Sequence, residues 1–587
     1  MDVTPSSICY NLCLYIIFAE NKATLTVLSY VHGASESPLI GASIGNVFDN
    51  TAARWPDRDA LVVPYQNIRW SYAELKQRVD AVAAGFIAMG LESGDRVGVW
   101  SPNNAQWILT QFATAKAGLI LVNINPAYRL GELEYALNKT ACKVLIFAPR
   151  LRTSDYLEML SKLLPELHLY KPGHLQEVAV PSLRWLIQLG DEVCDGVVNF
   201  NSIEKFATQT HHEQLSELNH VLQFDDPINI QFTSGTTGTP KAAILTHHNI
   251  VNNAYFAGER MALTEKDRLC IPVPMYHCFG IVLGSLCCVT HGATMVFASE
   301  GFDAHAALQT ISNESCTAVH GVPTMFIAML DDPEFNNFDL STLRTGVMAG
   351  APCPEELMQR VMTQMHLDQI TIAYGMTETG PVSFQTSTDD SIERRVQTVG
   401  KVLPHIEIKI VDDDKRIVSR GIAGELLTRG YCVMPGYWED DEKTDAAIDS
   451  ADWIASGDSA VIDEQGYCQI VGRLKDMLIR GGENIFPREI EEFLYQHPKV
   501  DQVEVIGVPD PKYGEEICAW IKLHEGQVAT EEEIKSFCEG KIAHFKIPRY
   551  ILFVDEFPMT VTGKVQKFVM REQMAERFEL NAARLDD

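Results

Sequence analysis

The sequence predicts an α/β fold, with a large N-terminal domain of several subdomains and mostly parallel sheets, followed by a small α+β domain at the C-terminus. The chain has 587 residues, of which 46% are hydrophobic and 21% are charged, so it is long enough for several well-packed domains. From about Ile44 to Ile470, short β-branched or apolar runs alternate with amphipathic stretches. This alternation is typical of strands and helices that build a mostly parallel sheet.

The predicted elements of the large domain follow one another in this alternating order. The helix-like stretches include Tyr72–Met89 and Ala105–Lys116, and the strand-like runs include Arg96–Trp100, Leu119–Val122 and Lys143–Phe147. A second alternating block follows residues 472–479 and contains Val500–Val508, Glu516–Leu523, Glu531–Cys538 and Tyr550–Val554. We therefore expect residues 44–473 to form the large domain and residues 474–587 to form the small one.

Residues 1–43 precede the first predicted element. Their apolar run, Ile8–Ala19, is too short to cross a bilayer, and no basic region precedes it as a secretory signal requires. Arg54 is the first arginine, so the Arg-rich pattern of a mitochondrial presequence is missing. We expect this segment to be an unpacked tail or a degenerate targeting segment, and no transmembrane segment is predicted. A chain without residues 1–38 should keep its function.

The charge balance excludes one broad class of function. Acidic residues outnumber basic ones by 78 to 48, which gives a net charge of -30 and argues against a nucleic-acid-binding surface. Any polyanionic ligand must then be held by backbone N–H groups and a few well-placed cations. The 14 cysteines form no C-x-x-C pair and no Cys/His cluster at zinc spacing, so a reducing intracellular compartment is favoured over a disulfide framework.

The strongest motif is a loop of nine residues that follows the strand-like run Ile228–Phe232. The glycines let the backbone fold around an anion, the hydroxyls donate hydrogen bonds to phosphate oxygens, and the final lysine adds a positive charge. A flexible surface linker could supply any five of these residues, but it is not expected to supply all nine after a strand. A Walker A loop is excluded because the motif ends Pro-Lys-Ala. The nine residues are Thr233, Ser234, Gly235, Thr236, Thr237, Gly238, Thr239, Pro240 and Lys241.

These nine residues resemble the signature loop of the adenylate-forming superfamily, which contains acyl-CoA synthetases, coumarate ligases and beetle luciferases. The other signatures of the superfamily follow in the expected order, and the resemblance covers residues 45–575. They are Pro274–Gly280, Gly350–Pro352, Tyr374–Thr379, Ser456–Asp458, Gly472–Asp476, Arg480–Ile485 and Pro558–Lys564. The mitochondrial medium-chain acyl-CoA synthetases are the most similar branch, above all in Asp226–Lys241, Arg429–Trp438 and Gly540–Pro548.

The resemblance implies an acid–thiol ligase that uses ATP and Mg²⁺. Such an enzyme activates a small carboxylic acid, here a medium-chain fatty acid, as acyl-AMP and then transfers the acyl group to coenzyme A. An aryl- or hydroxycinnamate-CoA ligase and a luciferase-like adenylating oxygenase are the alternatives. A nucleotide-binding scaffold without catalysis is disfavoured because Lys564, Glu378 and Asp458 are all present. The resemblance also implies a mitochondrial location, with the cytoplasm as the alternative.

Several of these residues are implied to hold the nucleotide. Tyr374 ends the strand-like run Ile370–Ala373, and ligands of open α/β sheets bind at the carboxyl ends of strands. The resemblance makes its ring the adenine platform, with Gly350, Ala351 and Pro352 on the other face and with Gly375 and Met376 beside it. Asp458 would accept hydrogen bonds from the ribose hydroxyls, and Arg473 would reach the same nucleotide. The alternative for Asp458 is a solvated turn, which is the more common place for the aspartate of a Ser-Gly-Asp sequence.

Other residues are implied to act on the reacting groups. Thr377 would donate to the α-phosphate, and Glu378 offers a hard oxygen ligand for Mg²⁺. The resemblance puts His277 beside the substrate carboxylate, and a purely structural histidine is the alternative. Cys278 is expected only to pack.

The small domain is implied to be mobile and to serve the two half-reactions in turn. Lys564 would supply the cation for adenylation, and Lys475 corresponds to the hinge. After rotation, Gly481 and Gly482 would leave room for the narrow pantetheine arm of coenzyme A.

Overall fold

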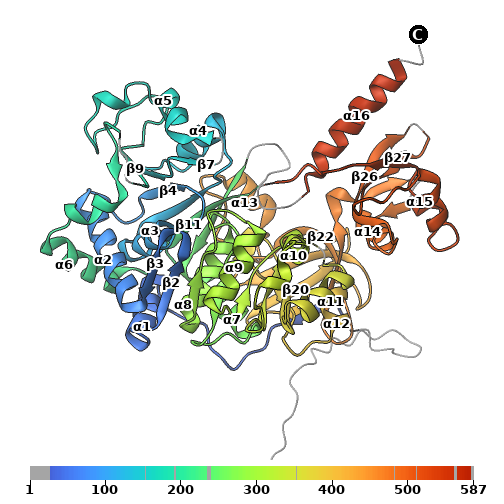
Figure 1. Ribbon diagram of the computed structural model, residues 1–587, viewed down its shortest axis with the longest axis horizontal. Coiled ribbons are helices and arrows are strands. Elements are labelled where there is room, and N and C mark those ends of the chain that lie inside the picture. The colour runs from blue at the N-terminus through green and yellow to red at the C-terminus, as the bar shows by residue number, and fades with distance from the viewer. Residues whose placement is uncertain are drawn as a thin grey trace, which may run out of the picture.

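The computed structural model describes residues 27–151, 154–190, 194–233, 240–351, 353–480, 483–510, 512–560 and 565–583 (Figure 1). Within these ranges the predicted α/β fold is confirmed, with a large N-terminal domain and a small C-terminal domain. Some predicted features lie outside the described residues, namely Ile8–Ala19, Ser234 to Thr239, Pro352, Gly481, Gly482 and Lys564. No helix within the described ranges combines the length and apolar character needed to cross a membrane.

The first sheet of the large domain has at one edge β11 and β12, the two strands on either side of the predicted phosphate loop. Its strand order is β10 (Val198–Asn199), β9 (Trp185–Gln188), β6 (Val144–Phe147), β4 (Arg96–Trp100), β5 (Ile120–Ile124), β11 (Pro227–Thr233) and β12 (Lys241–Thr246). All neighbours are parallel except β11 and β12. Every residue of β5 is buried, because helices cover parallel sheets on both faces.

The helices around this sheet begin where their capping residues predict. They are α1 (Ile44–Arg54), α2 (Tyr72–Ala88), α3 (Ala105–Ala117), α4 (Leu130–Lys139), α5 (Tyr156–Leu163) and α6 (Gln209–Val221). A capping box starts α2, because Ser71 accepts from the Glu74 N–H and the Glu74 side chain accepts from the Ser71 N–H. Helix α3 packs against α2 and against β5. The short strands β7 (Arg150–Leu151) and β8 (Ser154–Asp155) form a separate hairpin.

The second sheet has nine strands, and its central strands are parallel. The order is β19 (Lys401–Val402), β18 (Phe384–Gln385), β17 (Gln369–Tyr374), β16 (Thr345–Ala349), β15 (Ala318–Val319), β13 (Arg268–Cys270), β14 (Thr294–Val296), β2 (Asp59–Val63) and β3 (Ile68–Ser71). The associated helices are α7 (His247–Arg260), α8 (Cys287–His291), α9 (Ala304–Glu314), α10 (Pro323–Leu330), α11 (Glu355–Gln364) and α12 (Ile392–Gln397).

The third sheet differs from the predicted parallel pattern, because all of its strands are antiparallel. Its order is β1 (Tyr30–His32), β20 (Ile406–Val411), β21 (Gly424–Gly430), β22 (Ile454–Ile462) and β23 (Cys468–Arg473), with α13 (Asp441–Ala447) between β21 and β22. The connection between β22 and β23 is short, which permits antiparallel pairing without a crossover helix. The last two strands of this sheet carry Asp458 and Arg473.

The expectation of an unpacked N-terminal segment is wrong for residues 27–43. Tyr30–His32 forms the edge strand β1 against β20, and the Tyr30 hydroxyl donates to Glu407 Oε2 at 2.6 Å. Ser29 is fully buried, and its hydroxyl donates to the Ser419 carbonyl at 2.9 Å. Because this strand pairs with residues almost 380 positions away, no local pattern could predict it.

The small domain has its own sheet and its own hydrophobic clusters. Strands β25 (Glu483–Ile485), β24 (Leu478–Arg480), β27 (Gly514–Leu523) and β26 (Val500–Asp510) lie in this order, and β28 (Tyr550–Phe553) pairs with β27. Helices α14 (Pro487–Leu494) and α15 (Glu531–Cys538) contribute to one cluster, and α16 (Lys567–Ala583) contributes to another. Figure 1 shows this domain at one end of the molecule, with α16 projecting from it.

Candidate active site

The two ends of the phosphate loop meet beside a carboxylate. Thr233 and Lys241 lie opposite each other in the antiparallel pair of β11 and β12. The Thr233 hydroxyl donates to Glu378 Oε1 at 3.2 Å. Glu378 belongs to the short helix η6 (Thr377–Thr379), which follows β17 of the second sheet. The structure therefore brings Thr233, Lys241 and Glu378 together from two sheets.

Tyr437 completes this cluster, and the sequence analysis did not identify it. Its hydroxyl donates to Glu378 Oε1 at 3.0 Å, and the Lys241 ammonium lies 4.9 Å from the centre of its ring. A bridge between Tyr437 and Ala243 of β12 holds the tyrosine in place. Burial, together with the Glu378 carboxylate, raises the pKa of Tyr437, so its hydroxyl stays protonated and able to donate. The only signal was its position in Arg429–Trp438, one of the stretches that resemble the superfamily.

The oxygen donors around Glu378 fit a magnesium ion that is bound together with a phosphate ligand. Mg²⁺ prefers oxygen ligands, usually one or two carboxylates, and completes its coordination with substrate phosphates and water. Glu378 supplies one carboxylate, and the Thr233 hydroxyl lies beside it. Among the residues that the structure describes, no group of three or more His, Cys, Asp or Glu side chains forms a metal cage. A single carboxylate beside a phosphate loop suits this mode of binding.

A second cluster lies at the end of β17, where the sequence predicts the nucleotide. Tyr374 is the last residue of β17, and its hydroxyl donates to Asp458 Oδ2. Asp458 and Arg473 lie opposite each other on β22 and β23, and Arg473 Nε is 3.6 Å from Asp458 Oδ1. Burial raises the pKa of Asp458, whereas the Tyr374 hydrogen bond and the Arg473 charge lower it.

The flanking residues of this second cluster reach the same edge of the sheet. Strand β16 is the parallel neighbour of β17, and Gly350 and Ala351 directly follow it. Gly350 has a φ of 91°, which favours glycine. A Cβ atom on Gly375 would lie 2.0 Å from the Pro381 carbonyl oxygen, so the backbone after Tyr374 needs a glycine at this position.

His277 and the Thr377 hydroxyl are linked through the Cys278 sulfur. The Phe279 N–H donates to His277 Nδ1 at 3.1 Å, so the neutral ring carries its proton on Nε2. The Cys278 sulfur lies 3.6 Å from His277 Nδ1 and 3.7 Å from the Thr377 hydroxyl. Cys278 is buried, in agreement with a packing role. The π-helix η4 (Phe279–Leu286) begins directly afterwards, and such helices are frequent at functional sites.

The structure describes the predicted hinge residue Lys475 and the residues on either side of two predicted small-domain motifs, Gly481–Gly482 and Lys564. Lys475 lies in the short helix η7 (Leu474–Asp476), and burial, with the nearby Arg473 charge, lowers its pKa. Arg480 and Glu483, which flank Gly481 and Gly482 in the sequence, lie opposite each other in strands β24 and β25. Met559 and Val565, which flank Lys564 in the sequence, form a β-bridge. These flanking residues belong to the small domain.

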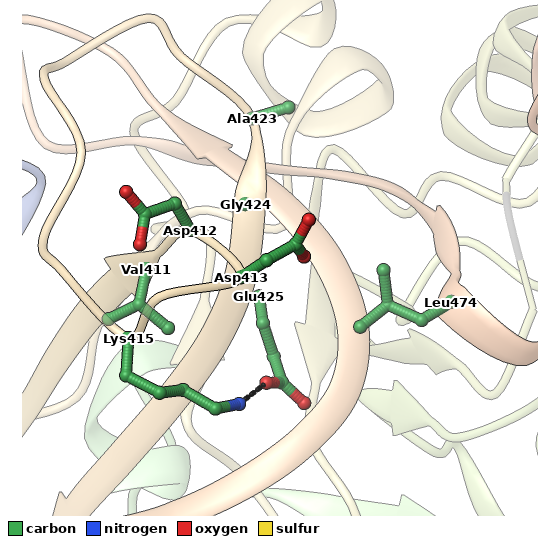
Figure 2. A pocket seen from close by; sticks show the side chains of 8 residues that line it. All are labelled: Val411, Asp412, Asp413, Lys415, Ala423, Gly424, Glu425 and Leu474. Carbon is green, nitrogen blue, oxygen red and sulfur yellow. Dashed lines mark hydrogen bonds and ion pairs between the residues drawn. The ribbon is translucent and has the colours of Figure 1, made fainter. Parts of the chain in front are cut away.

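A separate cleft of about 290 Å³ lies beside the hinge (Figure 2). It is lined by Val411, Asp412, Asp413, Lys415, Ala423, Gly424, Glu425 and Leu474. Lys415 and Glu425 form an ion pair of 2.5 Å, and Figure 2 shows the Leu474 side chain across from them. None of the residues predicted to hold the nucleotide lines this cleft, so it is distinct from the site described above.

Two domains, with strands β11 and β12 beside the Glu378 carboxylate and a tyrosine–aspartate pair at the sheet edge, are the arrangement expected of adenylate-forming enzymes. The comparison with protein-family models supports the same class. Residues 48–438 match the AMP-binding enzyme model, and residues 489–564 match the model of the AMP-binding enzyme C-terminal domain. The chain therefore belongs to the AMP-binding enzyme family.

Individual relatives are similar over nearly the whole chain. The Bacillus subtilis protein YngI is 50% identical over 93% of this chain and 99% of its own length. The protein named medium-chain acyl-CoA ligase ACSF2, mitochondrial, of Danio rerio is 48% identical over 96% of this chain and 94% of its own length. Among solved structures, the anthranilate CoA ligase AuaEII in complex with anthranoyl-AMP superposes with a TM-score of 0.79 at 27% identity, covering 92% of this chain and 98% of that chain.

Proposed function

We propose that this protein is a medium-chain fatty acid:CoA ligase that activates the carboxylate as acyl-AMP, releases pyrophosphate and transfers the acyl group to coenzyme A. The main support is the convergence of Thr233, Lys241 and Glu378 beside the Tyr374–Asp458 pair. In this proposal the first set would hold the phosphates and the second would hold the nucleoside, on adjoining elements. The printed name of the Danio rerio relative supports the medium-chain substrate class.

In the first half-reaction, a carboxylate oxygen of the acid attacks the α-phosphorus of ATP, and the bond to pyrophosphate breaks. Two anions must approach each other, so positive charge and hydrogen-bond donors have to face the transferring group. Lys241 and Thr377 would provide these from the large domain, and Lys564 would provide a further cation from the small domain. Tyr374 would stack on the adenine, and Asp458 would accept from the ribose hydroxyls.

Glu378 would hold Mg²⁺ together with the Thr233 hydroxyl and the phosphates. The bound ion would offset the negative charge of the phosphate oxygens and of the departing pyrophosphate. Tyr437 would keep the carboxylate in place, because its hydroxyl donates to Glu378 Oε1. This leaves lone pairs of the same carboxylate for the ion.

In the second half-reaction, the thiol of coenzyme A loses its proton and attacks the acyl carbon, and the bond between that carbon and AMP breaks. Rotation about Lys475 would remove Lys564 and bring Gly481 and Gly482 to the site, where the missing side chains leave room for pantetheine. His277 would orient the acyl group in both steps. No acyl-enzyme on Cys278 is needed, because AMP already activates the acid.

The ligase activity is tested with purified protein, Mg-ATP, an acid and coenzyme A, by following both pyrophosphate and thioester. Thioester that forms only with all components present is the expected result. Pyrophosphate release with light emission and no thioester would instead support an adenylating oxygenase. Nucleotide binding without either product would overturn the proposal in favour of a scaffold.

The substrate class is tested with straight-chain acids from acetate to long-chain acids, together with coumarate. Each methylene that enters an apolar pocket contributes about 0.8 kcal/mol, which is roughly a fourfold gain in kcat/KM, until the end of the pocket is reached. We expect kcat/KM to rise to a maximum at medium length and then fall. A flat profile, or a maximum at acetate or coumarate, would contradict the medium-chain assignment.

The role of Glu378 is tested with Glu378→Gln, which keeps the shape of the side chain and removes its charge. Loss of one electrostatic contact to the transferring group typically costs about 100-fold in kcat or more. We expect this loss together with a raised requirement for Mg²⁺. Glu532→Gln, at an exposed position of α15, is the matched control and should leave both unchanged. An unchanged Mg²⁺ dependence in Glu378→Gln would remove Glu378 as the ligand.

We further propose a mitochondrial location, supported by the printed name of the Danio rerio relative. The Bacillus subtilis relative shows that similar proteins also occur in bacteria. A fluorescent protein fused to the C-terminus should co-localise with a mitochondrial marker. A diffuse cytoplasmic signal would contradict this location without affecting the proposed chemistry.

A further inference from the structure

A chain of buried amides connects the strand that enters the phosphate loop to the segment that carries His277. Gln231 Nε2 donates to Asn229 Oδ1 at 2.8 Å, and Asn229 Nδ2 donates to Asn123 Oδ1 at 2.8 Å. Asn123 Nδ2 then donates to the Tyr276 carbonyl at 2.9 Å. All three amide residues are only 2% exposed. The row of hydrogen-bonded amides therefore begins at Gln231, two residues before Thr233, and ends at the carbonyl of Tyr276, one residue before His277.

The sheet register explains why these amides meet. Strands β5 and β11 are parallel neighbours, and Gln231 lies opposite Asn123. Asn229 additionally donates to the Leu121 carbonyl at 2.9 Å, so its amide is held from two sides. The Asn229 oxygen accepts from Gln231, and the Asn123 oxygen accepts from Asn229. The Asn123 NH₂ group then donates to the Tyr276 carbonyl.

A second buried asparagine holds the same segment from another direction. Asn103 Nδ2 donates to the Val273 carbonyl at 2.9 Å, and Asn103 Oδ1 accepts from the Met275 N–H at 2.8 Å. Asn103 is 4% exposed. Between them, Asn103 and Asn123 bind four backbone groups of residues 273–276, because Asn123 Nδ2 also lies 3.5 Å from the Met275 carbonyl oxygen. The backbone immediately before His277 is therefore held by side chains of other elements.

The chemistry of the amides argues for a positioning role. A buried amide without a partner costs roughly 1–3 kcal/mol, so a polar chain in a core is maintained only if every link is made. Apolar side chains would fill the same space without this requirement. Directional hydrogen bonds add a defined position and orientation of the bound backbone, which a catalytic group needs to within a fraction of an ångström.

We propose that Asn123 is a positioning residue for His277, acting through the Tyr276 carbonyl, and that it sets the substrate acid relative to the phosphate loop. The inference rests on the proposed role of His277 beside the substrate carboxylate. Gln231, Asn229 and Thr233 lie on the same strand, β11. The buried amides would therefore fix the position of the segment before His277 relative to the strand that leads into the predicted ATP-binding loop. Asn123 does not touch the substrate in this scheme.

The test is a double-mutant cycle between Asn123→Leu and His277→Ala. Asn123→Leu keeps the side-chain size and removes every side-chain hydrogen bond of Asn123. We expect it to lower kcat/KM for the acid by 10- to 100-fold with less than a threefold change in KM for ATP. In the His277→Ala background the same substitution should lower kcat/KM by less than twofold, because its effect passes through His277.

Asn252→Leu is the matched structural control. Asn252 is fully buried, and in the described part of the chain its side chain binds the backbone of Ile40 and His248 and no backbone group of residues 273–276. Both Leu variants should lower the Tm, but Asn252→Leu should leave kcat/KM for the acid within twofold. If Asn123→Leu does not fold, Asn229→Leu replaces it, since this variant removes the donor to Asn123 Oδ1 and keeps the bond to Tyr276. The expected loss in kcat/KM is then smaller and is again absent in the His277→Ala background.

The outcomes separate the inference from the proposed function. An equal loss from the asparagine substitution in both backgrounds would overturn the inference, and so would a change in Tm without a change in kcat/KM. If His277→Ala alone keeps full activity while thioester still forms, His277 has no role in catalysis, and both that role and the inference fail although the ligase assignment stands. If no thioester forms in the unmodified protein, the proposed function itself fails.

Discussion

The edge strand β1 provides a sharp test of how the N-terminal segment contributes to the nucleotide site. A chain that begins at Leu39 lacks β1 and the residues that flank it. In addition to the ladder between β1 and β20, five backbone hydrogen bonds join this segment to residues 405–420, namely Ser29 N to Val418 O, Ile410 N to Ser29 O, Gly33 N to Ile406 O, His405 N to Gly33 O and Arg420 N to Val27 O. Truncation removes them all and leaves β20 as an exposed edge.

The loss of stability follows from these contacts. A hydrogen bond contributes about 1 kcal/mol net, so five contribute roughly 5 kcal/mol, from which the entropy of ordering the segment is subtracted. We expect a net loss of about 2–4 kcal/mol. At about 2–4 °C per kcal/mol for a unit of this size, the Tm should fall by roughly 5–15 °C. Because β22 and β23 of the same sheet carry Asp458 and Arg473, KM for ATP should also rise. This replaces the expectation from the sequence that a chain without residues 1–38 keeps its function.

The assay compares three chains, which begin at Met1, Val27 and Leu39. A chain that begins at Val27 keeps every contact named above, so it serves as the control for truncation itself. Thermal unfolding and KM for ATP are measured on all three. If the chain from Leu39 has the same Tm and the same KM for ATP as the chain from Val27, the strand contributes nothing measurable and the reasoning fails.

Three further predictions follow from the small domain and the nucleotide site. Lys564→Ala should lower acid-dependent pyrophosphate release by orders of magnitude and spare thioester formation from supplied acyl-AMP, whereas Gly482→Leu should do the reverse; equal damage to the same half-reaction would refute alternating domains. Burial raises the pKa of Glu504 to about 7, so its neutral form stabilises the fold at low pH and this contribution is lost as pH rises from about 5 to 8. The Tm of Glu504→Gln should therefore fall less over that range than that of the unmodified protein, and parallel Tm profiles would contradict this. Gly375→Ala should raise KM for ATP at least tenfold, because its Cβ would lie 2.0 Å from a backbone carbonyl oxygen, whereas Gly131→Ala meets no atom within 4 Å and should have no effect; equal values of KM would show that the turn can adapt.

Local patterns of sequence predicted the elements that depend on neighbouring residues. The helix predicted at Tyr72–Met89 is α2, and Glu531–Cys538, which belongs to the second alternating block without an assigned element type, is helix α15. Strand Arg96–Trp100 was also predicted with the bounds that β4 has. Periodicity and capping act within a few residues of the chain, so they can be read without knowledge of the fold.

Pairings between distant segments could not be predicted in this way. Strand β1, the Tyr437–Glu378 hydrogen bond and the amide chain from Gln231 to Tyr276 each depend on a register between different elements. An asparagine in a strand gives no sign of which carbonyl it will bind. The antiparallel third sheet was missed for the same reason, since alternation shows that strands are present but not their direction.

The sequence by itself determined which chemical groups this chain contains and their order along the chain. These groups are the predicted phosphate loop, Tyr374, Glu378, Asp458 and Lys564. Only the tertiary structure decided which of these groups meet. It placed the Thr233 hydroxyl and the Tyr437 hydroxyl on one carboxylate oxygen, and it placed Asp458 against Tyr374 from a different sheet. The physical reason is that hydrogen bonds and ion pairs act over about 3–4 Å, a distance that is set by the packing of sheets and helices and not by separation along the chain.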